Sequence, residues 1–197
     1  MKKIAIVTLS DFNNYGNRLQ NYALERIITS QGYDVVSLVD FRPNLLKTSV
    51  KTIIKKDGIK FTDRMKKIRR LKNFLDFDKK YVNTFPVNAG EFSSVSDDEY
   101  HCFIVGSDQV WNPDWAKYTY DRMFLRFCSP TKRISYAASF GVDKIPEKWV
   151  DKYKAGLIDF KALSVREDKA VDIVKNTIGI TCHKVLDPTM LLERAEW

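Results

Sequence analysis

The sequence predicts an α/β fold in which a parallel sheet is flanked by helices. Three short runs, residues 3–9, 33–39 and 101–105, consist mainly of apolar residues, as strands buried on both faces of a parallel sheet do. Residues 17–30, between the first two runs, repeat apolar side chains at the three- to four-residue spacing of a helix. A strand, a helix and a second strand of this length form a βαβ unit, which joins parallel strands. With 44% hydrophobic residues, the 197-residue chain can also bury a sizeable core.

The loop between the first strand and the helix, residues 10–16 (SDFNNYG), is rich in polar residues. A loop that leads into a helix N-terminus presents backbone N–H groups and the positive end of the helix dipole, which together bind anions. A dinucleotide-binding motif is not present, because it needs three glycines and this loop has Gly16 alone. The alternative is purely structural, with Asn14 or Asn17 capping the helix. The buried stripe of the helix is predicted to consist of Leu19, Tyr22, Ala23, Arg26 and Ile27.

The positive charge of the chain is concentrated in one tract. Residues 47–80 carry 13 lysines and arginines against 4 aspartates and glutamates, a balance of +9, while the whole chain has a net charge of +8. We expect an amphipathic helix or a helix pair there, whose basic side chains form a solvated face or contact an anionic membrane. Nucleic-acid binding is not expected, because aromatic residues are not interleaved with the basic ones and no recognition motif is present. The apolar face is predicted to contain Phe61, Met65, Ile68 and Leu75.

A second group of polar residues follows the apolar run at 101–105, in the stretch FIVGSDQVWNP (residues 103–113). Gly106 allows a sharp turn where the strand ends. Ser107, Asp108 and Gln109 then place a hydroxyl, a carboxylate and an amide at the carboxyl end of the strand, where open α/β sheets bind ligands. The alternative is an ordinary capped turn, with Trp111 filling the core.

The rest of the chain continues the alternation of strands and helices. Residues 81–99, which include Pro86, Gly90 and several serines, are expected to be a connecting loop. Asp187, which precedes a proline, is expected to cap a last helix that opens at LLERAEW (residues 191–197). Strands are predicted at 132–137, 162–165 and 183–186, and helices at 146–160 and 167–176.

Composition excludes several classes of site and location. The three cysteines are odd in number and widely spaced, and only two histidines are present, so neither a disulfide framework nor a metal site is expected. No apolar run approaches the ~20 residues of a membrane span, and the first residues lack a small-residue cleavage site. We therefore expect a cytoplasmic protein.

Five segments together carry a resemblance to a known family. NYGNRLQNYAL (14–24), FIVGSDQVWNP (103–113), SYAASFG (135–141), LSVRE (163–167) and VLDPTMLL (185–192) resemble the polysaccharide pyruvyl transferase family. Members transfer the enolpyruvyl portion of phosphoenolpyruvate to sugar hydroxyls of cell-surface polymers, usually as a pyruvate ketal. The resemblance implies one half of a two-domain architecture of the GT-B type. Residues 1–197 would form a single Rossmann-like amino-terminal domain with a basic helical insertion at about 47–80.

The resemblance also implies a set of substrate-binding residues and no cofactor, with phosphoenolpyruvate as the donor substrate. Arg166 matches the arginine of the family's SVRE or SVRD motif, and a guanidinium can hold a carboxylate or a phosphate with two hydrogen bonds. The alternative for Arg166 is an ion pair with Glu167 or Asp168. The residues that match the family at the expected cleft are Asn14, Gly16, Asn17, Ser107, Asp108, Gln109 and Arg166.

The catalytic acid is not identified by the resemblance. The family's second domain is expected to supply a histidine acid and basic donor-binding residues, and neither His101 nor His183 is a good candidate, so we expect the 197-residue chain alone to be inactive. The acceptor is expected to be a surface polysaccharide or its lipid-linked precursor, reached at the inner face of the cell membrane. Two alternatives stay open: a GT-B glycosyltransferase that uses a nucleotide sugar, and a fragment without catalytic function.

Overall fold

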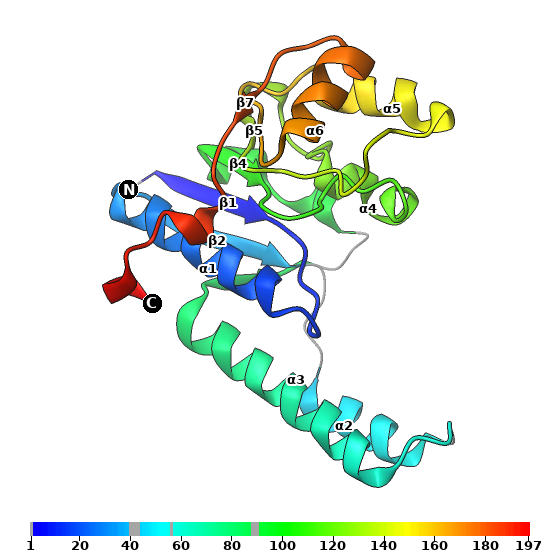
Figure 1. Cartoon of the computed structure of the whole chain (residues 1–197). Coiled ribbons are helices and arrows are strands. Elements are labelled where there is room, and N and C mark those ends of the chain that lie inside the picture. Colours follow the sequence, from blue (N-terminus) through cyan, green and yellow to red (C-terminus); the bar gives the residue numbers. More distant parts are fainter. Residues whose placement is uncertain (1, 40–43, 56, 88–90) are drawn as a thin grey trace.

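The structure is a computed structural model that describes residues 2–39, 44–55, 57–87 and 91–197 (Figure 1). Its centre is a five-stranded sheet with the strand order β3-β2-β1-β4-β5, in which every neighbouring pair is parallel. This arrangement confirms the predicted α/β fold with a Rossmann-like sheet. The strands are β1 (Lys3–Val7), β2 (Asp34–Val39), β3 (Thr84–Pro86), β4 (Cys102–Val105) and β5 (Arg133–Ser135).

Helices precede or follow most of these strands. A second, two-stranded parallel sheet of β6 (Ser164–Val165) and β7 (His183–Lys184) lies beyond β5, to which isolated bridges connect it. Short 3₁₀ turns complete the chain, among them Pro188–Met190 and Arg194–Glu196. The helices are α1 (Tyr15–Ser30), α2 (Leu45–Ile54), α3 (Phe61–Tyr81), α4 (Ala116–Met123), α5 (Glu147–Leu157) and α6 (Asp168–Asp172), the last continued by a π-helical turn, Ile173–Ile178.

The two faces of the sheet bury different side chains, because successive residues of a strand point to opposite faces. Ile4 and Ile6 of β1 pack with Leu24 and Ile28 of α1 on one face. Ala5 and Val7 point to the other face, into the larger core. The strands therefore carry apolar residues at nearly every position, which is the pattern that the sequence showed.

The larger core is aromatic and has Trp111 at its centre. The indole is fully buried, and its Nε1 donates a hydrogen bond to the carbonyl oxygen of Met123 at 2.9 Å. The hydroxyl of Tyr153 in turn donates to the carbonyl oxygen of Trp111 at 2.8 Å. Satisfying both polar atoms lets these large rings be buried without an unpaired donor. Trp111 thus fills the core, as the structural alternative proposed.

Helix α1 starts earlier and faces the sheet differently from the prediction. Its N-cap is Asn14, one of the two candidates, and the first helical residue is Tyr15. The predicted apolar stripe is wrong apart from Ala23, since Leu19 is exposed and the buried apolar residues are Leu24 and Ile28. The face of α1 that meets the sheet is largely polar instead, because Gln20 bonds to Thr8 after β1 and Asn21 and Glu25 accept from Ser37 of β2. The buried polar residues of the helix are Asn17, Arg18, Gln20, Asn21 and Glu25.

Three other predictions need correction. The segment 81–99 is not only a loop, because Thr84–Pro86 forms the edge strand β3, where a proline is tolerated; Gly90 lies outside the described residues. The strand predicted at 183–186 is limited to His183–Lys184. The last residues form a short 3₁₀ turn, Arg194–Glu196, in place of the predicted helix.

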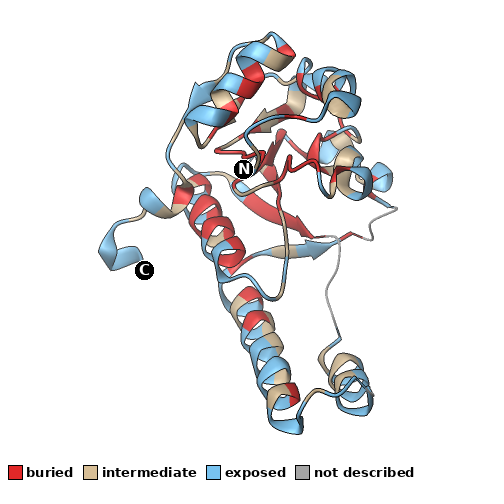
Figure 2. Cartoon of the chain, turned by 45° about the vertical axis from the view of Figure 1, so that its right-hand side comes forward, coloured by how far each residue is buried: buried red, intermediate tan, exposed pale blue. Residues whose placement is uncertain are grey.

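The basic tract forms a pair of helices, α2 and α3, which extend away from the sheet (Figures 1 and 2). The second half of α3 is fixed to the body, because Phe74 is buried and Asp78 forms an ion pair with Arg18 of α1 at 2.9 Å. Helix α2 has no buried residue among those described. Among the described residues, the contacts that hold the pair to the body therefore lie in the second half of α3.

Candidate substrate site at the carboxyl ends of the central strands

The candidate site lies where the strand order of the sheet reverses. The chain runs from β1 outward to β2 and β3, and then crosses to β4 and β5 on the other side of β1. The loops that follow β1 and β4 therefore diverge at the carboxyl end of neighbouring strands, whose last residues Val7 and Val105 are paired. In open α/β sheets a ligand crevice forms at this switch point. Both polar segments singled out in the sequence begin here.

The turn after β4 requires glycine at position 106. Gly106 has a φ of +114°, and a Cβ at this position would lie 2.2 Å from the carbonyl oxygen of Tyr136. The backbone of β4 can therefore approach the segment after β5 only without a side chain. Two residues later Asp108 has a φ of +79°, which aspartate tolerates better than most residues. This turn directs the Asp108 carboxylate toward α1.

Asp108 and Asn17 join the two polar segments. The Nδ2 group of Asn17, in the first turn of α1, donates a hydrogen bond to Oδ2 of Asp108. The other oxygen, Oδ1, accepts from the backbone N–H of Gln109 at 2.7 Å. A carboxylate has about four lone-pair positions. Asp108 is therefore oriented from two sides and keeps capacity to accept further hydrogen bonds.

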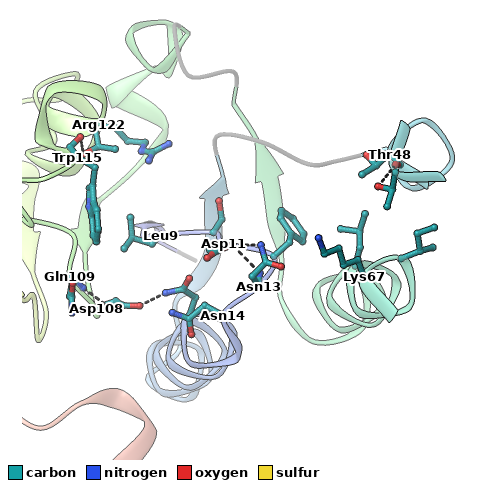
Figure 3. A pocket seen from close by; sticks show the side chains of 17 residues that line it. Leu9, Asp11, Asn13, Asn14, Thr48, Lys67, Asp108, Gln109, Trp115 and Arg122 are labelled. Carbon is teal, nitrogen blue, oxygen red and sulfur yellow. Dashed lines mark hydrogen bonds between the residues drawn. The ribbon is translucent and has the colours of Figure 1, made fainter. Parts of the chain in front are cut away.

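A pocket of about 760 Å³ opens beside this pair. In Figure 3 Asp108 and Gln109 lie on one side of the pocket, and Lys67 of α3 and Thr48 of α2 lie on the far side. The loop after β1, which also lines the pocket, lies between these two sides. Four of the predicted site residues line the pocket, namely Asn14, Asn17, Asp108 and Gln109. The other lining residues are Leu9, Ser10, Asp11, Phe12, Asn13, Thr48, Thr52, Lys67, Ile68, Leu71, Trp115, Thr119 and Arg122.

Ser107 and Gly16 have positions that explain them without a ligand. Ser107 is fully buried, and its hydroxyl lies 2.8 Å from Oδ2 of Asp187, to which it donates. Gly16 is the second residue of α1, where a Cβ would lie 3.1 Å from Oδ1 of Asn14, the oxygen that caps the helix. Neither residue lines the pocket, so their role in substrate binding stays a prediction.

Arg166 is brought close to the site but is engaged by carboxylates. Its Nη1 donates to Oδ2 of Asp187 at 3.0 Å, and its Nε lies 3.5 Å from Glu167, the ion pair that the sequence offered as an alternative. Asp168, the other alternative partner, pairs with Lys184 instead, at 2.7 Å. Arg166 does not line the pocket either.

Asp187 is the centre of a polar network that the sequence did not predict. Asp187 caps the 3₁₀ turn Pro188–Met190 in place of the predicted last helix, because Oδ1 accepts from the N–H and the hydroxyl of Thr189. Oδ2 accepts from Ser107 and Arg166. Burial alone would raise the pKa of Asp187, but the hydrogen bonds from these three residues hold it below its usual value. Asp187 therefore stays ionised and links the turn after β4 to Arg166, the residue that follows β6.

Sequence reasoning missed Gln20, which positions the turn from the α1 side. Its Nε2 donates to the hydroxyl of Thr8 at 3.0 Å, and its Oε1 accepts from the backbone N–H of Ser107 at 2.9 Å. Gln20 lies one helical turn after Asn17, so both side chains share the face of α1 that meets the strand ends. This spacing was the available signal. Gln20 was missed because the buried face of the helix was predicted from the spacing of its apolar residues alone.

The pocket is suited to a ligand with several hydroxyl groups. Amides such as those of Asn14 and Gln109 both donate and accept hydrogen bonds, and the carboxylates of Asp11 and Asp108 accept them. Among the described residues no group of three or more histidine, cysteine or acidic side chains could hold a metal ion. His101 and His183 are both exposed and do not line the pocket, so neither is placed as a proton donor there.

Comparison with known proteins gives one match. A family model described as polysaccharide pyruvyl transferase matches residues 14–197, a range that includes all seven predicted site residues. No curated protein and no solved structure matches the chain significantly.

Proposed function

The chain belongs to the polysaccharide pyruvyl transferase family, and on this premise we propose that it takes part in transferring pyruvate from phosphoenolpyruvate to a sugar hydroxyl of a surface polysaccharide or its lipid-linked precursor. The observation that carries the proposal is the Asn17–Asp108 pair. It joins two of the segments that resemble the family, 91 residues apart, at the edge of one pocket.

The pocket is proposed to receive the sugar acceptor. Asp108 would accept a hydrogen bond from a sugar hydroxyl, while the amides of Asn14 and Gln109 would form hydrogen bonds with neighbouring hydroxyls. The Asn17 amide holds the carboxylate in place before the acceptor arrives, so less freedom is lost on binding. A carboxylate that accepts a hydrogen bond from the sugar hydroxyl also makes the oxygen of that hydroxyl more nucleophilic toward the enolpyruvyl carbon.

Arg166 is proposed to contact the donor. Phosphoenolpyruvate carries a carboxylate and a phosphate, and arginine has five N–H donors, of which the contacts to Asp187 and Glu167 engage those of Nη1 and Nε. The side chain is 32% exposed, so part of it is accessible to a ligand. A guanidinium in contact with the phosphate would stabilise the negative charge that develops as the phosphate leaves.

The reaction also needs an acid that protonates the methylene carbon of the enol. Within the described residues no histidine lines the pocket. We therefore expect the 197-residue chain by itself to bind substrates without completing the transfer.

The acceptor role of Asp108 is tested in cells. Deleting the gene should remove pyruvate from the surface polysaccharide, and the intact gene should restore it. Asp108→Asn should restore roughly a tenth to a hundredth of the wild-type pyruvate content, because a charge-assisted hydrogen bond is lost at nearly constant side-chain volume. Asp114→Asn is the matched control, since this exposed aspartate on the same segment does not line the pocket.

Two outcomes would contradict the proposal. If the deletion removes a sugar residue and leaves pyruvate unchanged, the protein acts as a glycosyltransferase. If Asp108→Asn restores pyruvate as fully as Asp114→Asn does, the pocket beside Asp108 is not the acceptor site.

A further inference from the structure

Helix α2 directs its apolar side chains into solvent. Leu46 is 78% exposed and Ile54 is 68% exposed, and Val50 and Ile53 are exposed as well. Positions 46, 50, 53 and 54 are separated by three or four residues, so they share one side of the helix. The opposite side carries Leu45 and the hydroxyl residues Thr48, Ser49 and Thr52, which are half-buried.

This orientation is the reverse of what a helix on a globular surface adopts, where the apolar stripe faces the core. The polar side of α2 faces the pocket and is bonded to α3. Thr48 and Thr52 line the pocket, and Arg64 of α3 donates to the carbonyl oxygen of Thr52. Arg64 also bonds to Asp57 and to the carbonyl oxygen of Ile59 at 3.1 Å, which fixes the connection between the helices. The outward apolar face is therefore a defined feature of the fold.

Basic side chains border this apolar face. Lys47 and Lys51 lie beside Ile54 around the axis of α2, because consecutive residues of an α-helix are about 100° apart and positions 47, 51 and 54 therefore fall on adjoining parts of its surface. Within the described parts of the chain, neither lysine forms an ion pair, in contrast to Lys66 and Lys72 of α3, which pair with Asp63 and Asp76. The other basic residues of the helix pair for which the described residues supply no ion-pair partner are Lys60, Lys67, Arg69, Arg70, Lys79 and Lys80.

We propose that the outward face of α2, formed by Leu46, Val50, Ile53 and Ile54 with Lys47 and Lys51, docks on an anionic lipid surface. The apolar side chains enter the region between headgroups and acyl chains, and the lysines contact anionic headgroups. None of the helices in the described parts of the chain is both long and apolar enough to cross a bilayer, so the contact is peripheral.

Charge and apolar exposure together select lipid over other partners. A nucleic acid would engage the lysines but leave Leu46 and Ile54 in water. A second copy of the chain would place the same lysines opposite each other, and like charges at an interface cost affinity. The position of α2 also agrees with a surface contact, because it lies at the end of the molecule farthest from α5 and α6 (Figure 1).

The proposal is tested by sedimentation of the intact chain with vesicles. Vesicles of phosphatidylglycerol mixed with phosphatidylcholine are compared with pure phosphatidylcholine, at about 50 mM and about 500 mM salt. Binding should require the anionic lipid and weaken at high salt. The variant Lys47→Gln/Lys51→Gln should lower the partition coefficient about 25-fold, at roughly fivefold for each charge.

Two further variants separate the apolar contribution from net charge. Leu46→Gln/Val50→Gln/Ile54→Gln should lower the partition coefficient by at least about tenfold at unchanged net charge, and circular dichroism checks that the helix content is retained. Lys148→Gln/Lys154→Gln removes two exposed charges from α5 and should leave binding within about twofold of the wild type.

Three results would overturn the proposal. The chain could remain in the supernatant with anionic vesicles at low salt. The α5 variant could lose as much binding as the α2 lysine variant, which would make the effect one of net charge alone. Sedimentation velocity could show a dimer that the triple glutamine variant dissociates, in which case the face is an interface between copies.

Discussion

At the residue scale, the candidate site depends on hydrogen bonds between segments far apart in the chain. Asp187 is the clearest case, because it receives hydrogen bonds from Thr189, Ser107 and Arg166. Ser107 directly precedes Asp108, so Asp187 is connected through it to the turn that carries the pocket carboxylate. A change at Arg166 is therefore expected to act on Asp187 as well as on a donor substrate.

Replacing Arg166 by alanine separates these two roles. If Arg166 holds the donor, Arg166→Ala should weaken phosphoenolpyruvate binding about ten- to a hundredfold, measured by calorimetry, because a charge-assisted contact is worth roughly 1.5 to 3 kcal/mol. Asp187 keeps its bonds to Thr189 and Ser107, so the melting temperature at neutral pH should change little. Asp168→Ala is the control, since this carboxylate is exposed and pairs with Lys184.

The pH dependence of stability provides a second readout for the same variant. The folded-state pKa of Asp187 is lowered, so its stabilising contribution is present above the unfolded pKa of about 4 and is lost as the pH falls through the folded value. Without Arg166 the lowering should be smaller and the acid loss of stability shallower. If phosphoenolpyruvate affinity is unchanged while this acid profile flattens, Arg166 is only the partner of Asp187.

At the scale of elements, the turn after β4 depends on close backbone approach. Gly106→Ala would place a methyl group 2.2 Å from the carbonyl oxygen of Tyr136, at a φ of +114°. Overpacking and backbone strain each cost about 1 to 3 kcal/mol, so denaturant unfolding should show a loss of roughly 2 to 6 kcal/mol. Gly32→Ala is the matched control, because Gly32 has a φ of +84° with nothing within 4 Å of the added carbon.

The control is expected to lose only about 1 kcal/mol, from the left-handed backbone alone. Equal losses in the two variants would show that the segment after β5 moves away easily. The approach of Tyr136 would then not be what fixes the turn.

The strands that were predicted well are those buried on both faces. β1, β2 and β4 lie in the middle of the sheet, so burial demands apolar residues and the local pattern records it. β3 was missed because it is an edge strand of three residues in which Phe85 is exposed and Pro86 is present. An edge strand is defined by pairing with β2, which no local pattern encodes.

The sequence also predicted only those parts of the candidate site that follow from the order of the central strands. Asn17 lies in the first turn of the helix that follows β1, and Asp108 lies in the turn that follows β4, so knowing that parallel strands end at one edge is enough to bring them together. Lys67 and Trp115 line the same pocket but come from α3 and from the start of α4. Their positions depend on how those helices pack, and short-range spacing does not contain that information.

At the scale of the whole molecule, burial divides the described structure into parts of unequal stability. β1 and β4 are buried along almost their full length, and the second half of α3 is held through Phe74 and Asp78. Figure 2 shows isolated buried positions on α3 and none on α2, which has no buried residue among those described. Helices with few buried contacts open locally at low free energy while the core stays folded.

Hydrogen exchange should reveal this division. Backbone amides of α2 are expected to exchange by local opening, at least about a hundredfold faster than those of β1 and β4, which exchange near the global unfolding limit. Arg64→Ala removes the contacts to Asp57 and to the carbonyl oxygens of Thr52 and Ile59, so it should accelerate exchange in α2 roughly tenfold further.

The same substitution should leave exchange in β1 and β4 unchanged, because the hydrogen bonds and the ion pair of Arg64 lie within the helix pair and its connection, at the end of α3 far from the sheet. Arg69→Ala is the control for lost charge, since Arg69 is exposed on the same helix. If Arg64→Ala accelerates exchange in the strands as much as in α2, the helix pair unfolds together with the sheet. The molecule would then be one cooperative unit, and the apolar face of α2 would be held as rigidly as the core.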